Sequence, residues 1–399
     1  MDKLTDYLKS TIDAGEVPSL YALVSKKKRP LYSFGAGKVQ EGLNKPPSET
    51  TIYRGASMTK AITAVAVMQL VEAGKLSLQD PLAKIIPAFT GLEIFAVSES
   101  GEESTSPTPI APTIHHLLTH TSGITYGWFG PEELDAKYQE KELNRLFLPT
   151  SDTLEQRIDQ LATLPLKFTP GEMWDYSLSY DVLGRVIEIV SGQSLYAYFD
   201  EHILSPLGMV DTHFEVPQEK ANRLTELYTF DADENLEKVP PLNRETGSGT
   251  QRDFLEFSSD YITEGNANYH SAGSGLCTTA ADYFRFLQML LNKGVFEGHR
   301  ILSPDTIDLM CQNHTGDFPI YLEGHGSGYG YGFGVVTEKD EGTDPSNIGS
   351  ISWGGIFNTY YWVDPKEELI GILMTQVFPF AQLPLRADFK RLVYKNING

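Results

Sequence analysis

The chain has 399 residues and an ordinary hydrophobic content of 41%, so it can bury a large core and is expected to divide into two domains or subdomains. Its 53 acidic residues exceed its 32 basic ones, and the resulting formal charge of -21 argues against binding to nucleic acid or to an anionic membrane surface. The two cysteines, Cys277 and Cys311, are isolated in the sequence and are compatible with reduced thiols. These features indicate a globular protein.

The first 20 residues resemble an amphipathic helix that ends near Gly15, and they lack the apolar run of a secretory signal. The longest apolar stretch, 61–71, is far shorter than the ~20 residues that a membrane span requires. We therefore expect no membrane partner and a cytoplasmic location. Nothing in the sequence specifies an oligomeric state.

Strands are predicted at both ends of the chain. Two lie at 19–25 and 29–37, and three more lie within 349–355, 358–365 and 368–377. Short turns link the C-terminal strands, which is typical of an antiparallel meander.

The middle of the chain is predicted to be mostly helical, with helices at 154–165, 179–192 and 195–208. Two polar stretches, 97–113 and about 231–268, are interpreted as loops. Both are too long for simple connections, and we expect them to border a pocket.

A serine stands three residues before a lysine within Gly55–Lys60, at the predicted start of a helix. Residues 61–71 are apolar on nearly every side and Gly74 follows as a stop, so this helix should be buried. Ser57 would lie in the first turn, where backbone N–H groups lack helical partners. Lys60 would share its face, and apolar surroundings lower the pKa of an amine. The pattern predicts a serine nucleophile with a lysine base.

A second Ser-x-x-Lys match, Ser25 to Lys28, has a different context. Its three consecutive lysines are followed by Arg29 and Pro30, which indicates an exposed turn between two strands. No apolar helix is present to bury a lysine there, so the context favours Ser57 as the nucleophile.

Tyr176 precedes the predicted helix at 179–192. A phenol beside an ammonium group is more easily deprotonated, and a tyrosine with a lysine can relay a proton from the serine to the leaving group. Taken alone, Tyr176 is equally compatible with a half-buried core aromatic.

Paired glycines lie between two predicted strands, in Trp353-Gly354-Gly355-Ile356. Such a pair marks a bulge or a close approach of the backbone to another group, although an ordinary hairpin turn also fits. The N–H after the glycines could donate to an oxyanion.

Three histidines, His115, His116 and His120, raise the question of a metal site, because the last two would share a helical face. The chain has no HExxH motif and no evident third ligand, so capping or packing around 119–123 is the preferred role. We predict neither a metal nor another cofactor. An α/β-hydrolase is disfavoured because the chain has no Gly-x-Ser-x-Gly motif.

Taken together, the three elements at Ser57–Lys60, Tyr176–Leu178 and Trp353–Gly355 resemble the class C β-lactamase and penicillin-binding-protein-like serine hydrolases. The esterase branch of these proteins, often called family VIII carboxylesterases, is the most similar. The resemblance extends over nearly the whole chain and includes the stretches 113–123, 168–171, 206–209, 272–276 and 278–283.

This resemblance implies an α/β fold of the α+β type, an antiparallel sheet flanked by helices. One domain would combine residues 1–85 and 266–399, and a mainly helical domain would be inserted at 86–265. It also implies that Ser57 is the nucleophile, that Lys60 activates it and that Tyr176 shuttles the proton. The backbone N–H groups of Ser57 and Ile356 would form the oxyanion hole.

The departures from the family pattern concern the substrate. Leu178 stands where lactamases and peptidases of the family have an asparagine that binds a substrate carboxamide. Trp353 stands at the first position of the triad Trp353-Gly354-Gly355, where those proteins have a lysine or histidine. The predicted substrate-binding residues are Leu178, Trp353, Gly354 and Gly355. The two changes make this site more apolar, which suits short to medium acyl esters of small molecules. A carboxylesterase is therefore the leading hypothesis. The alternatives are β-lactamase or D-alanyl peptidase activity, acyl transfer to an acceptor other than water, and an inactive binding protein.

Overall fold

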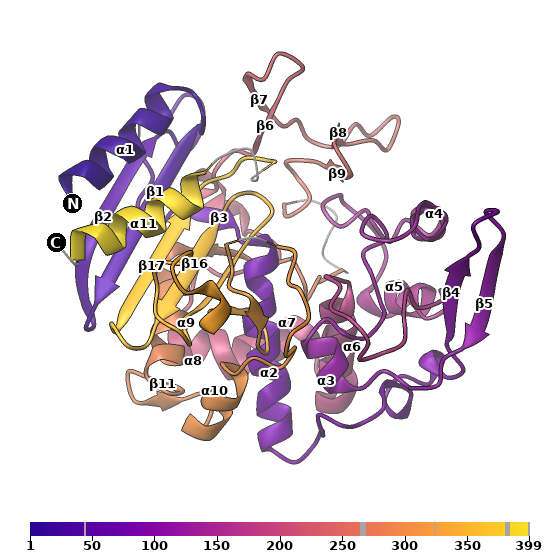
Figure 1. Cartoon of the computed structure of the whole chain (residues 1–399). Coiled ribbons are helices and arrows are strands. Elements are labelled where there is room, and N and C mark those ends of the chain that lie inside the picture. The colour runs from indigo at the N-terminus through magenta and orange to yellow at the C-terminus, as the bar shows by residue number, and fades with distance from the viewer. Residues whose placement is uncertain (44, 264–268, 323, 380–383, 398–399) are drawn as a thin grey trace.

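The computed structural model describes residues 1–43, 45–263, 269–322, 324–379 and 384–397. Its main sheet is antiparallel and has seven strands in the order β13-β14-β15-β16-β17-β1-β2. These strands are β1 (Ser19–Lys26), β2 (Arg29–Gly37), β13 (Gly328–Tyr329), β14 (Gly334–Val335), β15 (Ile351–Gly354), β16 (Tyr360–Asp364) and β17 (Leu369–Met374). Strands β2, β1, β17 and β16 lie on the left of Figure 1. The five strands predicted from sequence are confirmed. The sheet joins both ends of the chain, because β1 pairs with β17.

The hairpin between β1 and β2 contains the second Ser-x-x-Lys match. Lys27 and Lys28 are exposed and have φ values of +51° and +61°, so they form the tight turn between the two strands. The prediction of an exposed turn at this site is confirmed.

Alternating side chains give the sheet two buried faces. On β16, Trp362 packs edge to face against Phe389, with ring centroids 5.3 Å apart, whereas Tyr361 points to the other face and packs against Tyr283 at 5.1 Å. The first face is covered by α1 (Asp2–Asp13) and α11 (Leu385–Ile397), which lie side by side in Figure 1. The second face is covered by α9 (Ala280–Leu291) and the helices beyond it.

Helix α2 (Thr59–Glu72) runs through the middle of the molecule and is buried on all sides along most of its length (Figure 1). It contacts α6 (Ser179–Ser191), and after its last turn Gly74 takes a φ of +66°. The sequence-based prediction of a buried helix over 61–71 with a glycine stop is confirmed.

The prediction at 154–165 corresponds to α5 (Leu154–Leu161), and 195–208 corresponds to α7 (Leu195–Phe199), a π-helical turn (Asp200–Leu204) and α8 (Ser205–Leu207). The other helices are α3 (Ile114–Leu118), α4 (Glu132–Glu140) and α10 (Pro304–Met310). Helices α3 to α6 lie beside α2 on the side away from the sheet, whereas α8 and α10 lie near α9 and β11 (Val295–Phe296) in Figure 1. No helix in these described ranges is long and apolar enough to cross a bilayer.

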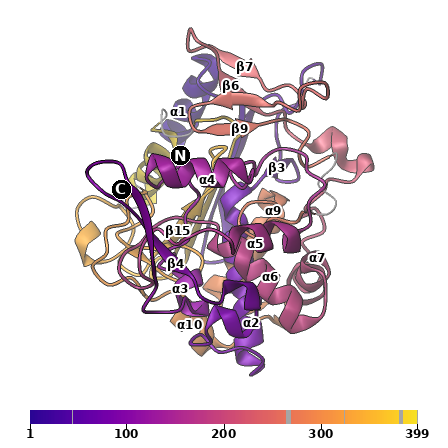
Figure 2. The same ribbon diagram turned by 90° about the vertical axis from the view of Figure 1, so that its right-hand side faces the viewer.

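The two predicted loops contain strands. The stretch 97–113 includes β5 (Glu103–Pro107), which pairs with β4 (Glu93–Val97) in a hairpin at the right-hand edge of Figure 1. Figure 2 views the molecule from that side, with β4 toward the viewer. The stretch 231–268 includes parts of two further hairpins, and its residues 264–268 lie outside the described residues. These hairpins are β6 (Tyr228–Phe230) with β7 (Leu236–Lys238) and β8 (Thr250–Arg252) with β9 (Leu255–Phe257). The pure-loop expectation was wrong because exposed polar strands lack the hydrophobic alternation that identifies a strand.

Two short pairs are the remaining strands: β3 (Ile52–Arg54) with β10 (Cys277–Thr279), and β11 (Val295–Phe296) with β12 (His299–Arg300). The pairing of β3 with β10 fixes the segment just before Ser57, because β3 is followed directly by the turn that contains this serine. The limits proposed for the two domains, at 85/86 and 265/266, stay a prediction.

Candidate active site

Ser57 lies in a single 3₁₀ turn, Ala56–Met58, between β3 and α2. Thr59 fixes this turn, since its Oγ1 donates to the Ala56 carbonyl at 2.7 Å and accepts the Leu276 N–H at 3.0 Å. Ala56 has a φ of +45°, a left-handed conformation that costs a residue with a Cβ atom about 1 kcal/mol or more. The backbone conformation of Ala56 is therefore unfavourable by itself, and contacts with the surrounding structure hold the serine in place.

Lys60 is completely buried and points back toward this turn. Its Nζ lies 3.3 Å from Ser57 Oγ and donates to Tyr126 OH at 3.0 Å and to the Gly273 carbonyl at 2.8 Å. Burial lowers the pKa of Lys60 to about 7, and the nearby charge of Asp181 opposes this effect. A substantial fraction of the amine is therefore unprotonated at neutral pH and able to accept a proton.

Tyr176 is also buried, and its ring centroid lies 4.6 Å from Lys60 Nζ. Its hydroxyl accepts the Trp353 indole N–H at 3.3 Å. Burial raises the pKa of Tyr176 above its ordinary value, and hydrogen bonds with Ser57 and Trp353 only partly oppose the rise. This direction is opposite to the sequence-based expectation of an easily deprotonated phenol. The free-energy cost of burying a phenolate is larger than the stabilisation that the neighbouring groups give it. Tyr176 is a neutral phenol in the resting protein.

The paired glycines bring β15 against the turn of the serine. A Cβ atom added to Gly355 would lie only 2.5 Å from the Gly55 carbonyl oxygen and 3.2 Å from Ala56 Cβ, so the backbones touch here. Thr359 secures this approach, because its Oγ1 accepts the Gly355 N–H at 3.0 Å. Ile356 follows directly after this contact in the sequence. This contact is a close backbone approach, as the glycine pair predicted.

Neither of the two predicted oxyanion donors has a hydrogen-bond acceptor among the residues that the structure describes. The Ser57 N–H lies in the first turn, where helical acceptors are lacking, and the Ile356 N–H makes no hydrogen bond to any residue that the structure describes. Two unpaired N–H groups on adjoining segments suit an anionic oxygen between them.

The other predicted residues occupy less direct positions. Leu178 is buried where α6 begins, and Trp353 is 2% exposed, with its ring tilted against Tyr176 at 5.5 Å between centroids. His116 completes the capping box of α3 with Thr113. His120 Nδ1 shares a hydrogen bond with Ser177 Oγ at 3.0 Å. Among the residues described, no three or more His, Cys, Asp or Glu side chains are grouped to hold a metal.

Sequence reasoning missed two buried partners of Lys60. The Tyr126 hydroxyl accepts a hydrogen bond from the amine, and Asp181 is a fully buried carboxylate whose Oδ1 accepts the Tyr269 hydroxyl at 3.1 Å. Burial raises the pKa of Asp181, and the charge of Lys60 opposes that rise. Asp181 stands five residues after Tyr176 in the first turn of α6, but only the folded chain reveals that it faces the lysine.

An aromatic cluster extends from Tyr176 to the surface. Tyr126 stacks on Trp128 at 5.2 Å, Trp128 contacts Phe254 at 5.1 Å, and Phe129 lies 6.5 Å from Tyr176. Phe254 is 45% exposed, so the outer end of this cluster faces solvent. These contacts place apolar surface on one side of Tyr176.

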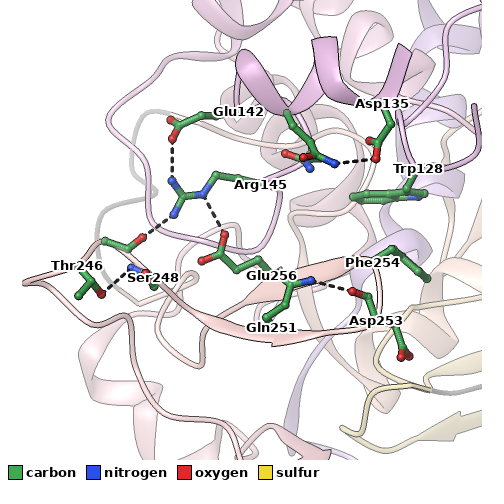
Figure 3. Close-up of a pocket in the computed structure, with 13 residues that line it drawn as sticks. Trp128, Asp135, Glu142, Arg145, Thr246, Ser248, Gln251, Asp253, Phe254 and Glu256 are labelled. Atoms are coloured by element: carbon green, nitrogen blue, oxygen red, sulfur yellow. Dashed lines mark hydrogen bonds and ion pairs between the residues drawn. The ribbon is translucent and has the colours of Figure 1, made fainter. Parts of the chain in front are cut away.

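Beyond Trp128 and Phe254 lies a polar cavity of about 470 Å³ (Figure 3). Arg145 occupies its far wall and pairs with Glu142 at 2.8 Å and with Glu256 at 3.4 Å. Residues from the stretch 231–268 line this cavity, so the expectation that this stretch borders a pocket is confirmed. The stretch 97–113 borders a second, shallower hollow through residues 103–105.

Comparison with known proteins identifies the scaffold. The beta-lactamase family model matches residues 4–395. Protein Rv1367c of Mycobacterium tuberculosis is 30% identical over 93% of this chain and 89% of its own length. Esterase EstB of Burkholderia gladioli is 30% identical over 89% and 84% respectively.

Among solved structures, EstCE1, described as a hydrolase with promiscuous acyltransferase activity, superposes with a TM-score of 0.81. It is 26% identical, and the match covers 98% of both chains. The scaffold, the order of the motifs and these relatives agree. The chain belongs to the beta-lactamase family of serine hydrolases, in its family VIII carboxylesterase branch.

Proposed function

We propose that this protein is a carboxylesterase that hydrolyses short to medium acyl esters through an acyl-serine intermediate. The main support for this proposal is the buried Lys60 amine, which lies 3.3 Å from Ser57 Oγ and whose pKa is lowered to about 7 by burial. Such an amine is matched to proton transfer near neutral pH, a contribution of roughly 10²- to 10⁴-fold in rate. The relatives support a serine hydrolase that acts on esters or transfers acyl groups.

In the acylation step, Lys60 Nζ accepts the hydroxyl proton as Ser57 Oγ forms a bond to the ester carbonyl carbon. The carbonyl π electrons move onto oxygen, and the resulting oxyanion accepts hydrogen bonds from the N–H groups of Ser57 and Ile356. When the tetrahedral intermediate collapses, the C–O bond to the alcohol breaks and the leaving oxygen takes a proton.

Tyr176 is suited to deliver that proton. Its raised pKa keeps the phenol protonated in the resting protein, and Lys60 restores its proton afterwards. Water then attacks the acyl-serine with the same groups acting in reverse order, which releases the acid and regenerates Ser57. Lys60 is thus the base and Tyr176 the proton relay.

The aromatic cluster around Tyr126, Phe129 and Tyr176 supports an apolar acyl group, since it offers a hydrocarbon surface next to the serine. Leu178 and Trp353 supply neither an amide nor a cation at the positions where lactam-cleaving relatives of the family have them. Esters are therefore favoured over β-lactams or D-alanyl peptides.

Acyl transfer is the second candidate. EstCE1, which covers 98% of this chain, is described as having promiscuous acyltransferase activity. The polar cavity beside Trp128 offers space and hydrogen-bonding groups for an acceptor alcohol in place of water.

The experiment compares a p-nitrophenyl butyrate ester with a chromogenic cephalosporin, each with the wild type and with Ser57→Ala. We expect ester turnover that disappears in Ser57→Ala and little cephalosporin cleavage. Strong cephalosporin cleavage would overturn the reading of Leu178 and Trp353. Adding an alcohol acceptor and measuring the ester formed separates transfer from hydrolysis.

An inactive binding protein of the same fold would turn over neither substrate, and a serine-directed fluorophosphonate would not label it at Ser57. Labelling of the wild type that is absent from Ser57→Ala would exclude that reading.

A further inference from the structure

Arg386, in the first turn of α11, lies directly beside the paired glycines of β15. A Cβ atom added to Gly354 would lie 3.0 Å from its Nη1 and 3.1 Å from its Cζ, so the guanidinium lies against the glycine backbone. Its Nε donates to Asn358 Oδ1 at 3.0 Å, and its Nη2 donates to the carbonyl oxygen of Gly355. Burial lowers the pKa of Arg386 to about 9, which leaves it cationic at neutral pH.

The Gly355 carbonyl belongs to the same peptide group as the Ile356 N–H. That carbonyl already accepts the Asn358 N–H at 3.0 Å, and the guanidinium adds a second, charged donor to the same oxygen. At the other end of the peptide, the Ile356 N–H has no acceptor among the described residues. A cation therefore holds one end of a peptide group whose other end is free to donate beside Ser57.

Hydrogen bonds at the two ends of a peptide group reinforce each other, because electron density drawn toward the carbonyl oxygen leaves the N–H more positive. A charged donor has a larger effect than a neutral one. The increase is largest when the N–H faces a full negative charge, as it does in a tetrahedral intermediate.

We propose that Arg386 is a positioning residue that orients and polarises the Gly355–Ile356 peptide, so that its N–H binds the oxyanion more strongly than it binds the ester carbonyl. This inference rests on the proposed function, in which Ile356 is an oxyanion donor. Arg386 comes from the C-terminal helix and supplies a positive charge near Gly354 and Gly355. Trp353, at the position where the family has a cationic residue, supplies none.

The test compares wild type, Arg386→Met and Arg386→Lys with p-nitrophenyl butyrate. Removal of a whole oxyanion donor costs about 10²- to 10³-fold in turnover, so weakening one donor is expected to lower kcat about 10-fold in Arg386→Met. KM should change by less than about twofold, because ground-state binding does not use the full charge of the oxyanion. Arg386→Lys keeps the charge but not the fork of donors, and an intermediate kcat is expected.

An alkylboronic acid supplies a readout that a merely structural role would not change. Its tetrahedral adduct with Ser57 places an oxygen in the oxyanion site, so its affinity should fall by about the same factor as kcat in Arg386→Met. The affinity of 1-butanol, a neutral ligand that forms no tetrahedral adduct, should stay unchanged. Arg391→Met is the matched control, since Arg391 is exposed on the same helix and pairs with Asp388 of that helix at 2.8 Å.

A rise in KM with kcat unchanged would overturn the inference, because it would assign Arg386 to substrate binding. A fall in kcat without loss of boronate affinity would overturn it as well. If Arg386→Met unfolds early in a thermal melt, the Arg386→Lys variant decides by the same two readouts. Wild type that turns over no ester would instead refute the proposed function, so the two failures are distinguishable.

Discussion

Replacement of Asp181 with asparagine is expected to move the acidic limb of the pH–rate profile to lower pH. Asp181 is a buried carboxylate, and its charge raises the pKa of Lys60 against the lowering caused by burial. A Cβ atom on Gly273 would lie 2.9 Å from Asp181 Oδ2 and 3.4 Å from Lys60 Nζ, which places the two atoms within about 6 Å of each other. Asparagine retains an oxygen that can accept the Tyr269 hydroxyl and removes the charge.

The size of the shift follows from Coulomb's law. Two unit charges about 6 Å apart at an effective dielectric constant of about 20 interact by roughly 3 kcal/mol, which corresponds to about 2 pKa units. The wild-type limb in kcat/KM should lie near the Lys60 pKa of about 7, with activity rising as the amine loses its proton. In Asp181→Asn the limb should fall by about 1 to 2 pH units, because the charge that raises the pKa of Lys60 is removed.

The assay is kcat/KM for p-nitrophenyl butyrate between pH 4.5 and 9, read at a wavelength where phenol and phenolate absorb equally. The matched control is Asp159→Asn, which removes an exposed carboxylate from α5 and should leave the limb where it is. A limb that stays fixed in Asp181→Asn, or moves to higher pH, would show that Lys60 is not the titrating base or that Asp181 carries no charge.

Three further outcomes are expected. Lys60→Ala and Tyr176→Phe should each lower kcat by at least ~10²-fold with the fold retained, and near-normal turnover in either would remove that residue from the mechanism. Gly355→Ala should lower kcat about 10²-fold, because the added Cβ would meet the Gly55 carbonyl at 2.5 Å; an unchanged kcat with intact circular dichroism would contradict the close approach. Trp353→Ala should change the preference among acyl chain lengths, measured with a series of p-nitrophenyl esters, and an unchanged preference would place Trp353 outside the substrate pocket.

Much of the fold could be predicted because its signals are local. The apolar stretch 61–71 and the strands near both termini carry their burial pattern in consecutive residues, and glycines mark their ends. The hairpin of β4 and β5 was missed because Glu103–Pro107 is exposed along its whole length and presents no apolar face. The break in helix 195–208 at a π-helical turn likewise has no simple sequence signature.

The candidate site divides in the same way. Ser57 and Lys60 share one helix end and could be paired from their spacing. Asp181, Tyr126 and Arg386 reach the site from separate elements, so their roles depend on burial and on long-range packing that spacing does not record. The pKa of Tyr176 shifted opposite to expectation for the same reason, because the cost of burial is a property of the assembled core.

The pairing of β1 with β17 also affects how the protein is made. During synthesis Ser57 and Lys60 leave the ribosome early, but the sheet edge beside β1 stays open until residues 369–374 follow. Contacts between such distant parts of a chain form slowly, since a long loop must close first. Lys60 also contacts Gly273, so the environment that lowers its pKa is incomplete until most of the chain has been made, and a shorter chain is expected to carry the serine without the activated lysine.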